Sequence, residues 1–166
     1  PEGFEVLDHL TTEFDPTNTP IAFEALATWI SKNEDPFDNT IERCAIGLRE
    51  GGNAVRQSAV CCLACLIAST PALLESTFVS EEDGELLSII SNYMTQSCEH
   101  TLSLLLRWLD KMGREMKVKG LMHQFRELCF KYQIEECANK IAYDTNKYGK
   151  SLRNQADHFI VRNGLN

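Results

Sequence analysis

The chain has 166 residues, 43% of them apolar and 24% charged, and a formal net charge of −8. These values are typical of a globular domain, so they exclude a collagen-like chain, a disordered tail and a membrane protein. The longest apolar run, residues 59–68, is about half the length of a membrane span, so we expect no membrane partner. We expect residues 1–166 to form a single all-helical domain, cut from a longer protein because the sequence starts at Pro1 without a methionine.

The cysteines indicate a reducing compartment, the cytoplasm or the nucleus. Their number is odd, and most of them occupy apolar helical positions, where a thiol behaves as a small hydrophobic side chain. They are Cys44, Cys61, Cys62, Cys65, Cys98, Cys129 and Cys137. Cys62 and Cys65 form a CxxC pair, but no second pair and no spaced histidines accompany it. We therefore expect most of the cysteines to pack in the core, and all seven to be free thiols that bind no metal.

Start signals divide the first part of the chain into helices. Residues 1–15 carry a short apolar stripe and are expected to form a loosely docked helix. Thr19 before Pro20, and Asp35 before Pro36, each combine a capping residue with a proline at the first helical position. The sequence therefore predicts a second helix from about residue 19 and a third from about residue 35.

Residues 41–70 are the stretch around which the rest of the chain is organised. Their first arm is an amphipathic helix, and Gly51 with Gly52 supplies the turn that ends it. Asn53 is a good N-cap for the second arm. That arm, residues 54–69, is apolar in almost every direction, so we expect a helix that is buried on several sides.

The segment from Asn53 to Val60, followed by Leu63 and Leu66, resembles the second half of an armadillo or HEAT-type helical repeat. In that pattern a turn residue precedes Val-Arg, a small residue and leucines at helical spacing. The resemblance covers about one repeat, residues 41–69, and no second copy follows at a period of about forty residues. It implies helical hairpins and a role in protein–protein recognition. We expect an irregular stack of eight or nine antiparallel helices, either a short α-solenoid-like array or an orthogonal bundle.

Periodic apolar stripes predict six helices in the remaining residues, and no alternating run predicts a strand. The predicted segments are about 71–78, 80–97, 101–112, 116–132, 134–142 and 151–162. Gly113 is expected to bend or end the helix that begins at Thr101, because glycine costs about 1 kcal/mol inside a helix. Ser151 is the expected cap of the last helix, and Asn163 with Gly164 is its expected stop.

No pattern of catalytic residues is present. The four histidines, His9, His100, His123 and His158, lie far apart and have no partner at helical spacing. No nucleophile motif and no phosphate-binding glycine loop occurs. We expect no enzyme activity and no cofactor.

Charge is unevenly distributed along the chain. Residues 1–99 contain 4 basic and 17 acidic residues, a balance of −13, whereas residues 100–166 contain 12 basic and 7 acidic residues, a balance of +5. Three of the basic residues fall at i, i+4 and i+7 on one helical face. The candidate partner-binding residues are Arg107, Lys111, Arg114, Lys117, Lys119 and Arg126.

Three interpretations of this basic set remain open at the level of sequence. It is a solvated face or a complement to the acidic first half, a docking surface for an acidic peptide or helix of another protein, or a surface for a nucleic-acid backbone. The overall negative charge of the chain and the lack of a known nucleic-acid-recognition motif argue against nucleic acid. The expected function is a non-catalytic protein–protein interaction or scaffolding domain, with a nucleic-acid-binding helical module as the alternative.

Overall fold

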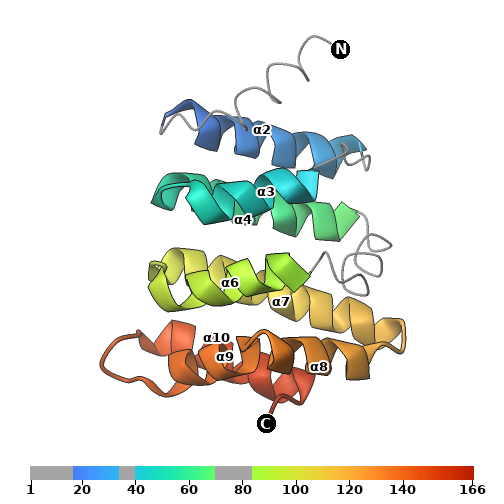
Figure 1. The fold of residues 1–166 in the computed structure, drawn as a ribbon, viewed down its shortest axis with the longest axis vertical. Helices are drawn as coiled ribbons and strands as arrows, with labels where there is room; N and C mark the ends of the chain where they lie inside the picture. Colours follow the sequence, from blue (N-terminus) through green and yellow to red (C-terminus); the bar gives the residue numbers. More distant parts are fainter. Residues whose placement is uncertain (1–16, 34–39, 70–83) are drawn as a thin grey trace. The chain divides into compact units, whose positions relative to one another are not determined.

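The computed structural model describes residues 17–33, 40–69 and 84–166, and every regular element in these ranges is a helix (Figure 1). The eight helices of this part of the chain are α2 (Asn18–Asn33), α3 (Thr40–Glu50), α4 (Asn53–Ser69), α6 (Gly84–Gln96), α7 (Glu99–Val118), α8 (Met122–Lys131), α9 (Ile134–Tyr143) and α10 (Lys150–Asn163). The all-helical class predicted from the sequence is confirmed. The helices predicted at residues 1–15 and 71–78, and the start signals at 35–36 and 80–83, lie outside the described residues.

The chain forms two compact units, Pro1–Thr70 and Pro71–Asn166, which are described separately below. The described helices of the first unit are α2, α3 and α4, and those of the second are α6 to α10. No linker-like stretch marks the boundary in the sequence. The prediction of one domain over residues 1–166 stays a prediction.

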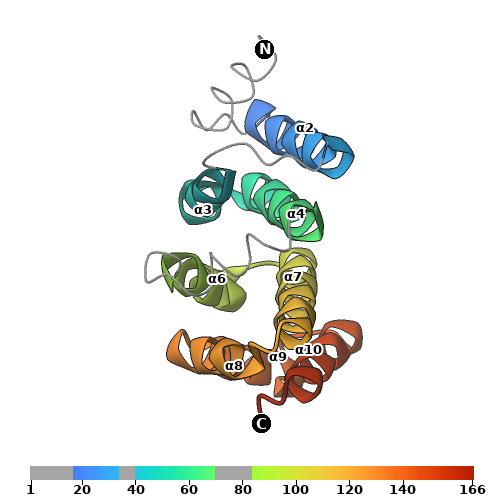
Figure 2. The ribbon, with the colours of Figure 1, turned by 90° about the vertical axis from the view of Figure 1, so that its right-hand side faces the viewer.

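Helix α4 is the centre of the first unit, because both α2 and α3 pack against it. The chain reverses at Gly51 and Gly52, which places α3 and α4 side by side (Figures 1 and 2). The buried side chains of α4 are Val55, Ser58, Ala59, Val60, Cys62 and Leu63. They point in several directions around the helix axis, so the expectation of a helix buried on several sides is confirmed for the described side chains.

A glycine allows the three helices of the first unit to approach closely. A Cβ atom at Gly47 of α3 would lie 3.0 Å from the ring of Phe23 on α2 and 3.3 Å from the Cβ of Ala59 on α4. Both neighbours are fully buried. The absence of a side chain at position 47 therefore lets α2 and α4 pack against the same point of α3.

None of the seven cysteines, all of which lie within the described ranges, forms a disulfide. Cys44 of α3 and Cys62 of α4 are both buried and interact with each other. Burial, and to a smaller extent the hydrogen bond to Cys62, raises the pKa of the Cys44 thiol well above its ordinary value. The Cys44 side chain therefore acts as a neutral core group at neutral pH.

In the second unit, α7 packs against α6, α8 and α10, while α9 packs against α6, α8 and α10. The buried face of α7 is mostly large and apolar, and it includes Leu102, Leu105, Leu106, Trp108, Leu109, Met112 and Met116. These residues recur every three or four positions, which is the spacing of one helical face. The prediction that this segment is a second central element is confirmed.

The end of α7 differs from the prediction. The helix continues through Gly113, which is buried, and ends at Val118. The break comes at Gly120, whose φ is +73°. There the Leu121 N–H donates to the Met116 carbonyl at 2.8 Å and the Gly120 N–H donates to the Lys117 carbonyl at 3.2 Å, a Schellman motif.

The prediction of one long helix over residues 116–132 is therefore wrong, because the glycine that stops α7 lies within that range. A second break, at Gln133 with φ of 60°, separates α8 from α9. Val118, which the sequence placed in the apolar stripe of the long helix, instead lies on the outer face of α7 with 84% of its surface exposed.

The predicted stop of the last helix is confirmed, whereas its start lies elsewhere. Gly164 has φ of 63°, and the Leu165 N–H donates to the Ile160 carbonyl at 3.0 Å. At the other end α10 begins at Lys150 rather than after Ser151. The N–H of Gly149 donates to Oε1 of Glu99 at 2.7 Å, so a carboxylate from the start of α7 satisfies a donor at the positive end of α10.

The buried thiol of Cys129 gives the protein a predictable response to alkaline pH. Burial, and to a smaller extent the nearby Glu135 carboxylate, raises the pKa of Cys129 from 9.0 to about 12. In the unfolded chain this thiol titrates near its ordinary pKa, so above about pH 9 the unfolded state loses a proton that the folded state keeps. The free energy of unfolding therefore falls with rising pH, by up to about 1.4 kcal/mol per pH unit for this one thiol.

Urea unfolding of the wild type and of Cys129→Ala at about pH 8, 9 and 10 measures this effect. We expect the decline above about pH 9 to be shallower in the variant by about 1 kcal/mol per pH unit. The slope is compared, and not the absolute stability, because the alanine also leaves a cavity. Equal slopes in the two proteins would contradict the raised pKa.

Candidate binding surface on α7 and α10

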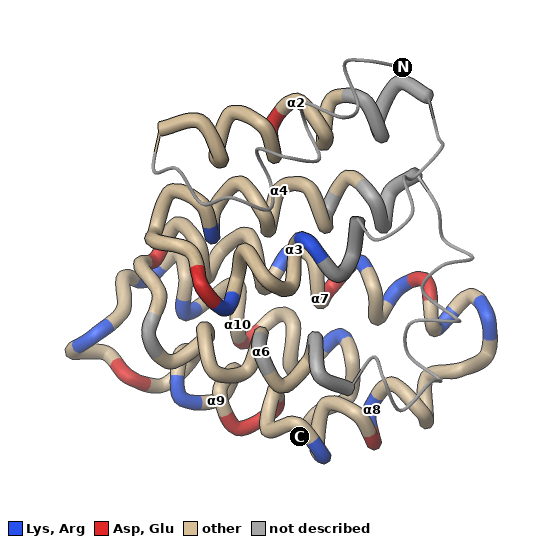
Figure 3. The backbone as a smooth tube through the Cα atoms, turned by 45° about the horizontal axis from the view of Figure 1, so that its top comes forward, with Lys and Arg blue, Asp and Glu red and all other residues tan. Residues whose placement is uncertain are grey.

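Three of the predicted partner-binding residues form one exposed row. Arg107, Lys111 and Arg114 lie on the single continuous helix α7, four and then three residues apart, so they share one face. Arg107 and Arg114 are exposed and Lys111 is half-buried. Figure 3 shows the basic residues spaced along α7. The exposed Val118 follows Arg114 by four residues and continues the same face.

The other three predicted residues are placed differently. Lys117 is exposed on α7, to one side of the row, and Lys119 lies in the turn that follows the helix. Arg126 is on α8, and its Nε donates to the Asn163 carbonyl at 2.8 Å. This hydrogen bond satisfies a carbonyl at the negative end of α10. The structure thus brings Arg107, Lys111 and Arg114 together, and it uses Arg126 to hold α10.

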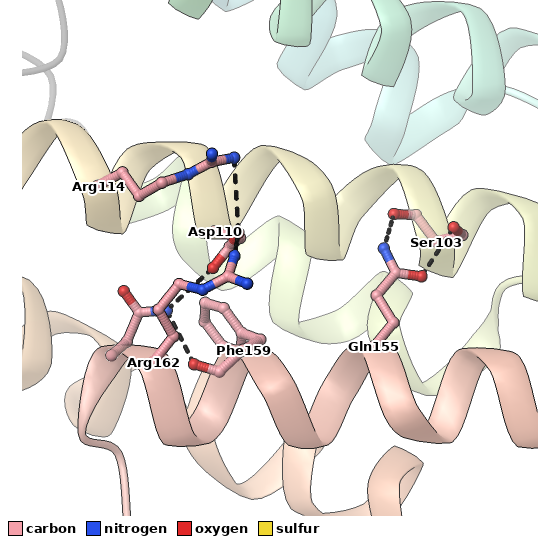
Figure 4. Close-up of polar contacts among 7 residues, drawn as sticks. Ser103, Asp110, Arg114, Gln155, Phe159 and Arg162 are labelled. Carbon is pink, nitrogen blue, oxygen red and sulfur yellow. Dashed lines mark hydrogen bonds and ion pairs between the residues drawn. The ribbon is translucent and has the colours of Figure 1, made fainter.

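Helices α7 and α10 run parallel and are joined at two points (Figure 4). At the first, the Ser103 hydroxyl donates to Oε1 of Gln155, and Nε2 of Gln155 donates to the Ser103 carbonyl, both at 2.8 Å. At the second, Arg162 donates to Asp110. Both pairs have the same offset of 52 residues. The two joints lie seven residues apart on each helix, or about 10 Å.

Between and around these joints lies a groove of about 390 Å³. Its floor contains Leu106 and Phe159, which are buried, and its remaining lining is polar. The polar lining residues are Ser103, Arg107, Asp110, Ser151, Asn154, Gln155, His158 and Arg162. The volume falls within the usual range of ligand pockets, about 300 to 1,000 Å³. Arg107 therefore belongs both to the exposed row and to the wall of the groove.

The charge inside the groove is unbalanced toward the positive side. Its one carboxylate, Asp110, is only 13% exposed and pairs with Arg162. It also interacts with Arg114 at 3.6 Å and accepts a hydrogen bond from the Asn163 amide at 3.4 Å. The side chain of Arg107, by contrast, has no hydrogen bond or ion pair with any residue in the described part of the chain. The uncompensated charge at this site is that of a guanidinium group.

The groove does not assemble a nucleophile with a base. Ser151 and His158 both line it, but they lie seven residues apart on α10, about 10 Å, which is beyond hydrogen-bond reach. The Ser103 hydroxyl is engaged by Gln155, and the Asp110 carboxylate by Arg162.

Sequence reasoning missed the α10 side of this site. Ser151, Asn154, Gln155, His158 and Arg162 follow one another at intervals of three, one, three and four residues, which is one polar face of a helix. The polar face could be recognised from this spacing in the sequence. Its contact with α7 could not be predicted, because only the packing of the second unit brings the two helices together.

A second cleft, of about 520 Å³, lies between α6, α9 and the residues that follow α9. It is lined by Met94, Thr95, Cys137, Lys140, Tyr143, Asp144, Lys147 and Tyr148. The hydrogen bond from Lys140 to Glu136 raises the pKa of that lysine, and the Lys147 ammonium lies over the Tyr148 ring. Both cations of this cleft therefore already have partners, unlike Arg107.

Among the described residues, no three histidine, cysteine or acidic side chains converge as metal ligands would. The CxxC pair, Cys62 and Cys65, lies within α4. No helix in the described ranges combines the length and the apolar character needed to span a bilayer.

Comparison with known protein families, with curated proteins and with solved structures finds no significant match to this chain. The resemblance of residues 41–69 to an armadillo or HEAT-type repeat therefore stays a prediction. The class of the protein rests on its own fold, which is all-helical.

Proposed function

We propose that this chain is a non-catalytic protein–protein interaction domain that binds an acidic peptide or helix of a partner protein. The observation that carries the proposal is the exposed row of Arg107, Lys111 and Arg114 beside a polar groove. A charged row next to a concave surface is the arrangement by which helical proteins hold acidic segments. Val118, at the end of the row, adds an exposed apolar contact.

Two further observations support this proposal over the nucleic-acid alternative. The chain as a whole carries −8, which repels an extended polyanion at a distance. The row spans seven residues of α7, about 10 Å, which is short for a track of phosphate contacts. The resemblance to armadillo and HEAT repeats and the seven thiols support a role in protein recognition in the cytoplasm or the nucleus.

Binding of a defined probe tests the proposal. The probe is a short fluorescein-labelled amphipathic peptide with glutamates on one helical face and leucines on the other, and its dissociation constant is measured by fluorescence polarisation. The row variant carries Arg107→Glu and Lys111→Glu within the row and Lys117→Glu beside it, and it keeps the Arg114–Asp110 pair intact. We expect the row variant to bind at least about tenfold more weakly at about 0.15 M salt, where long-range effects are screened, because charge reversal replaces attraction with repulsion.

A charge-matched control separates the row from net charge. Lys131→Glu, Lys140→Glu and Lys147→Glu change the same number of exposed cations elsewhere in the second unit. This control is expected to bind the probe within about threefold of the wild type once salt screens long-range effects. Equal loss in both variants would refute the row as the binding surface. Tight binding of a duplex or single-stranded oligonucleotide, with affinity falling linearly in a log–log plot against salt, would favour the nucleic-acid alternative.

A further inference from the structure

The groove between α7 and α10 is fixed before any partner arrives. The reciprocal Ser103–Gln155 pair and the Asp110–Arg162 pair hold the two helices together at two points along the groove. Asn163, which is fully buried, adds a hydrogen bond to the Phe159 carbonyl at 2.8 Å beside the second joint. A site whose walls are already held in place loses little conformational entropy on binding.

Each side chain in this groove that lacks a partner carries at least one hydrogen-bond donor. The side chains of Arg107, Ser151, Asn154 and His158 form no hydrogen bond or ion pair with the described residues. The acceptors that could have satisfied them are occupied, since Asp110 is bound by Arg162 and Gln155 is bound by Ser103. Convergent donors beside an uncompensated guanidinium are the requirements of a carboxylate ligand.

The register of the two helices sets the size of the ligand. With an offset of 52 residues, Arg107 lies beside His158 and Phe159, midway between the two joints. The space between the joints is about 10 Å long, which is room for one side chain rather than for a run of charges. Asn154, one turn before His158 on α10, extends the same wall.

We infer that the groove is a specificity site for one aspartate or glutamate side chain of the partner, whose carboxylate is held by Arg107 together with Asn154 and His158 of α10. This inference rests on the proposed function and deepens it: Lys111 and Arg114 attract the acidic segment, and the groove selects a single position within it. Arg107 belongs both to the row on α7 and to the groove.

The test uses the same glutamate–leucine probe and two α10 variants that leave the row of α7 unchanged. Asn154→Asp and His158→Glu each place a carboxylate in the groove, and Asn146→Asp makes the same change as the first at an exposed site outside it. We expect each groove variant to bind about tenfold more weakly than the wild type, because the new carboxylate repels the carboxylate of the probe and replaces a side chain that donates to it. Asn146→Asp is expected to bind as the wild type does.

Two measurements show whether one carboxylate is selected. When each glutamate of the probe is replaced in turn by glutamine, the loss of affinity should concentrate at one position. In NMR spectra of ¹⁵N-labelled protein, the side-chain NH₂ signals of Asn154 should shift on addition of the acidic probe. They should not shift when the all-glutamine probe is added.

The outcomes separate this inference from the proposed function. If the probe binds and the row variant weakens it, while the Asn154 signals stay fixed and Asn154→Asp binds normally, the groove inference is refuted and the interaction domain stands. An equal loss at every glutamate of the probe likewise refutes selection of one carboxylate. If the wild type does not bind the probe at all, both proposals fail.

Discussion

Leu63→Ala is expected to lower the free energy of unfolding of the first unit by about 2 to 5 kcal/mol. Leu63 is 2% exposed and lies on α4, which packs against both α2 and α3. Truncation removes apolar area from the core and leaves a cavity, because the two neighbouring helices are held in place by other contacts. Urea unfolding followed by far-ultraviolet circular dichroism measures the change.

The control for this prediction lies in the same unit. Glu50→Ala changes an exposed side chain at the end of α3 and is expected to alter stability by less than about 0.5 kcal/mol. If Leu63→Ala and Glu50→Ala had equal effects, α4 would not be the buried centre of this unit. Leu66, which follows Leu63 by three residues, lies in α4 as well, but its side chain is outside the described set.

Gly113→Ala is expected to destabilise the second unit by about 2 to 3 kcal/mol, although alanine favours the helix by about 1 kcal/mol over glycine. A Cβ atom at position 113 would lie 1.9 Å from Oδ1 of Asn163 and 3.1 Å from the ring of Phe125. Asn163 is 1% exposed and donates to the Phe159 carbonyl at 2.8 Å. Moving its amide would leave buried polar groups unpaired, at about 1 to 3 kcal/mol, so the steric effect outweighs helix propensity.

Two further variants isolate the cause. Gly52→Ala has no atom within 4 Å of the added Cβ and is expected to be nearly neutral. In a double-mutant cycle, Gly113→Ala should cost much less in the background of Asn163→Ala, because the side chain that it meets has been removed. A gain in stability from Gly113→Ala alone would show that α7 and α10 are not in close contact at this point.

The groove depends on the same crossing. Gly113 allows Asn163 to lie against α7, and Asn163 interacts with Asp110, which is itself bound by Arg162. A substitution at Gly113 is therefore expected to disturb one of the two joints that define the groove. The glycine that the sequence presented as a helix breaker thus helps to shape the candidate binding site.

Much of the secondary structure could be read from local patterns. The α3–turn–α4 hairpin follows from an amphipathic stripe and two glycines, but Asn53, the predicted cap, is already the first residue of α4, and the Arg56 N–H donates to the Gly52 carbonyl. The stop at Gly164 follows from glycine's access to positive φ. Helix α2 begins at Asn18, close to the predicted cap. These features involve residues within one or two turns of each other, so the order of residues is sufficient to predict them.

Gly113 and Gly120 show where local patterns are insufficient. Both stand in helix-forming surroundings, yet the first is inside α7 and the second ends it. The difference arises from neighbours distant in sequence, since α10 approaches Gly113 closely whereas a Cβ atom at Gly120 would have no atom within 4 Å. Helix propensity is a small term, about 1 kcal/mol, that close packing between helices can override.

The candidate site divides in the same way. The row of Arg107, Lys111 and Arg114 lies on one helix, so its spacing in the sequence was enough to predict a shared face. Its α10 half depends on two parallel helices meeting at an offset of 52 residues, a register set by Ser103 with Gln155 and Asp110 with Arg162. Spacing within a helix is dictated by the backbone itself, whereas the pairing of two distant helices is decided by which side chains fit together in the folded unit.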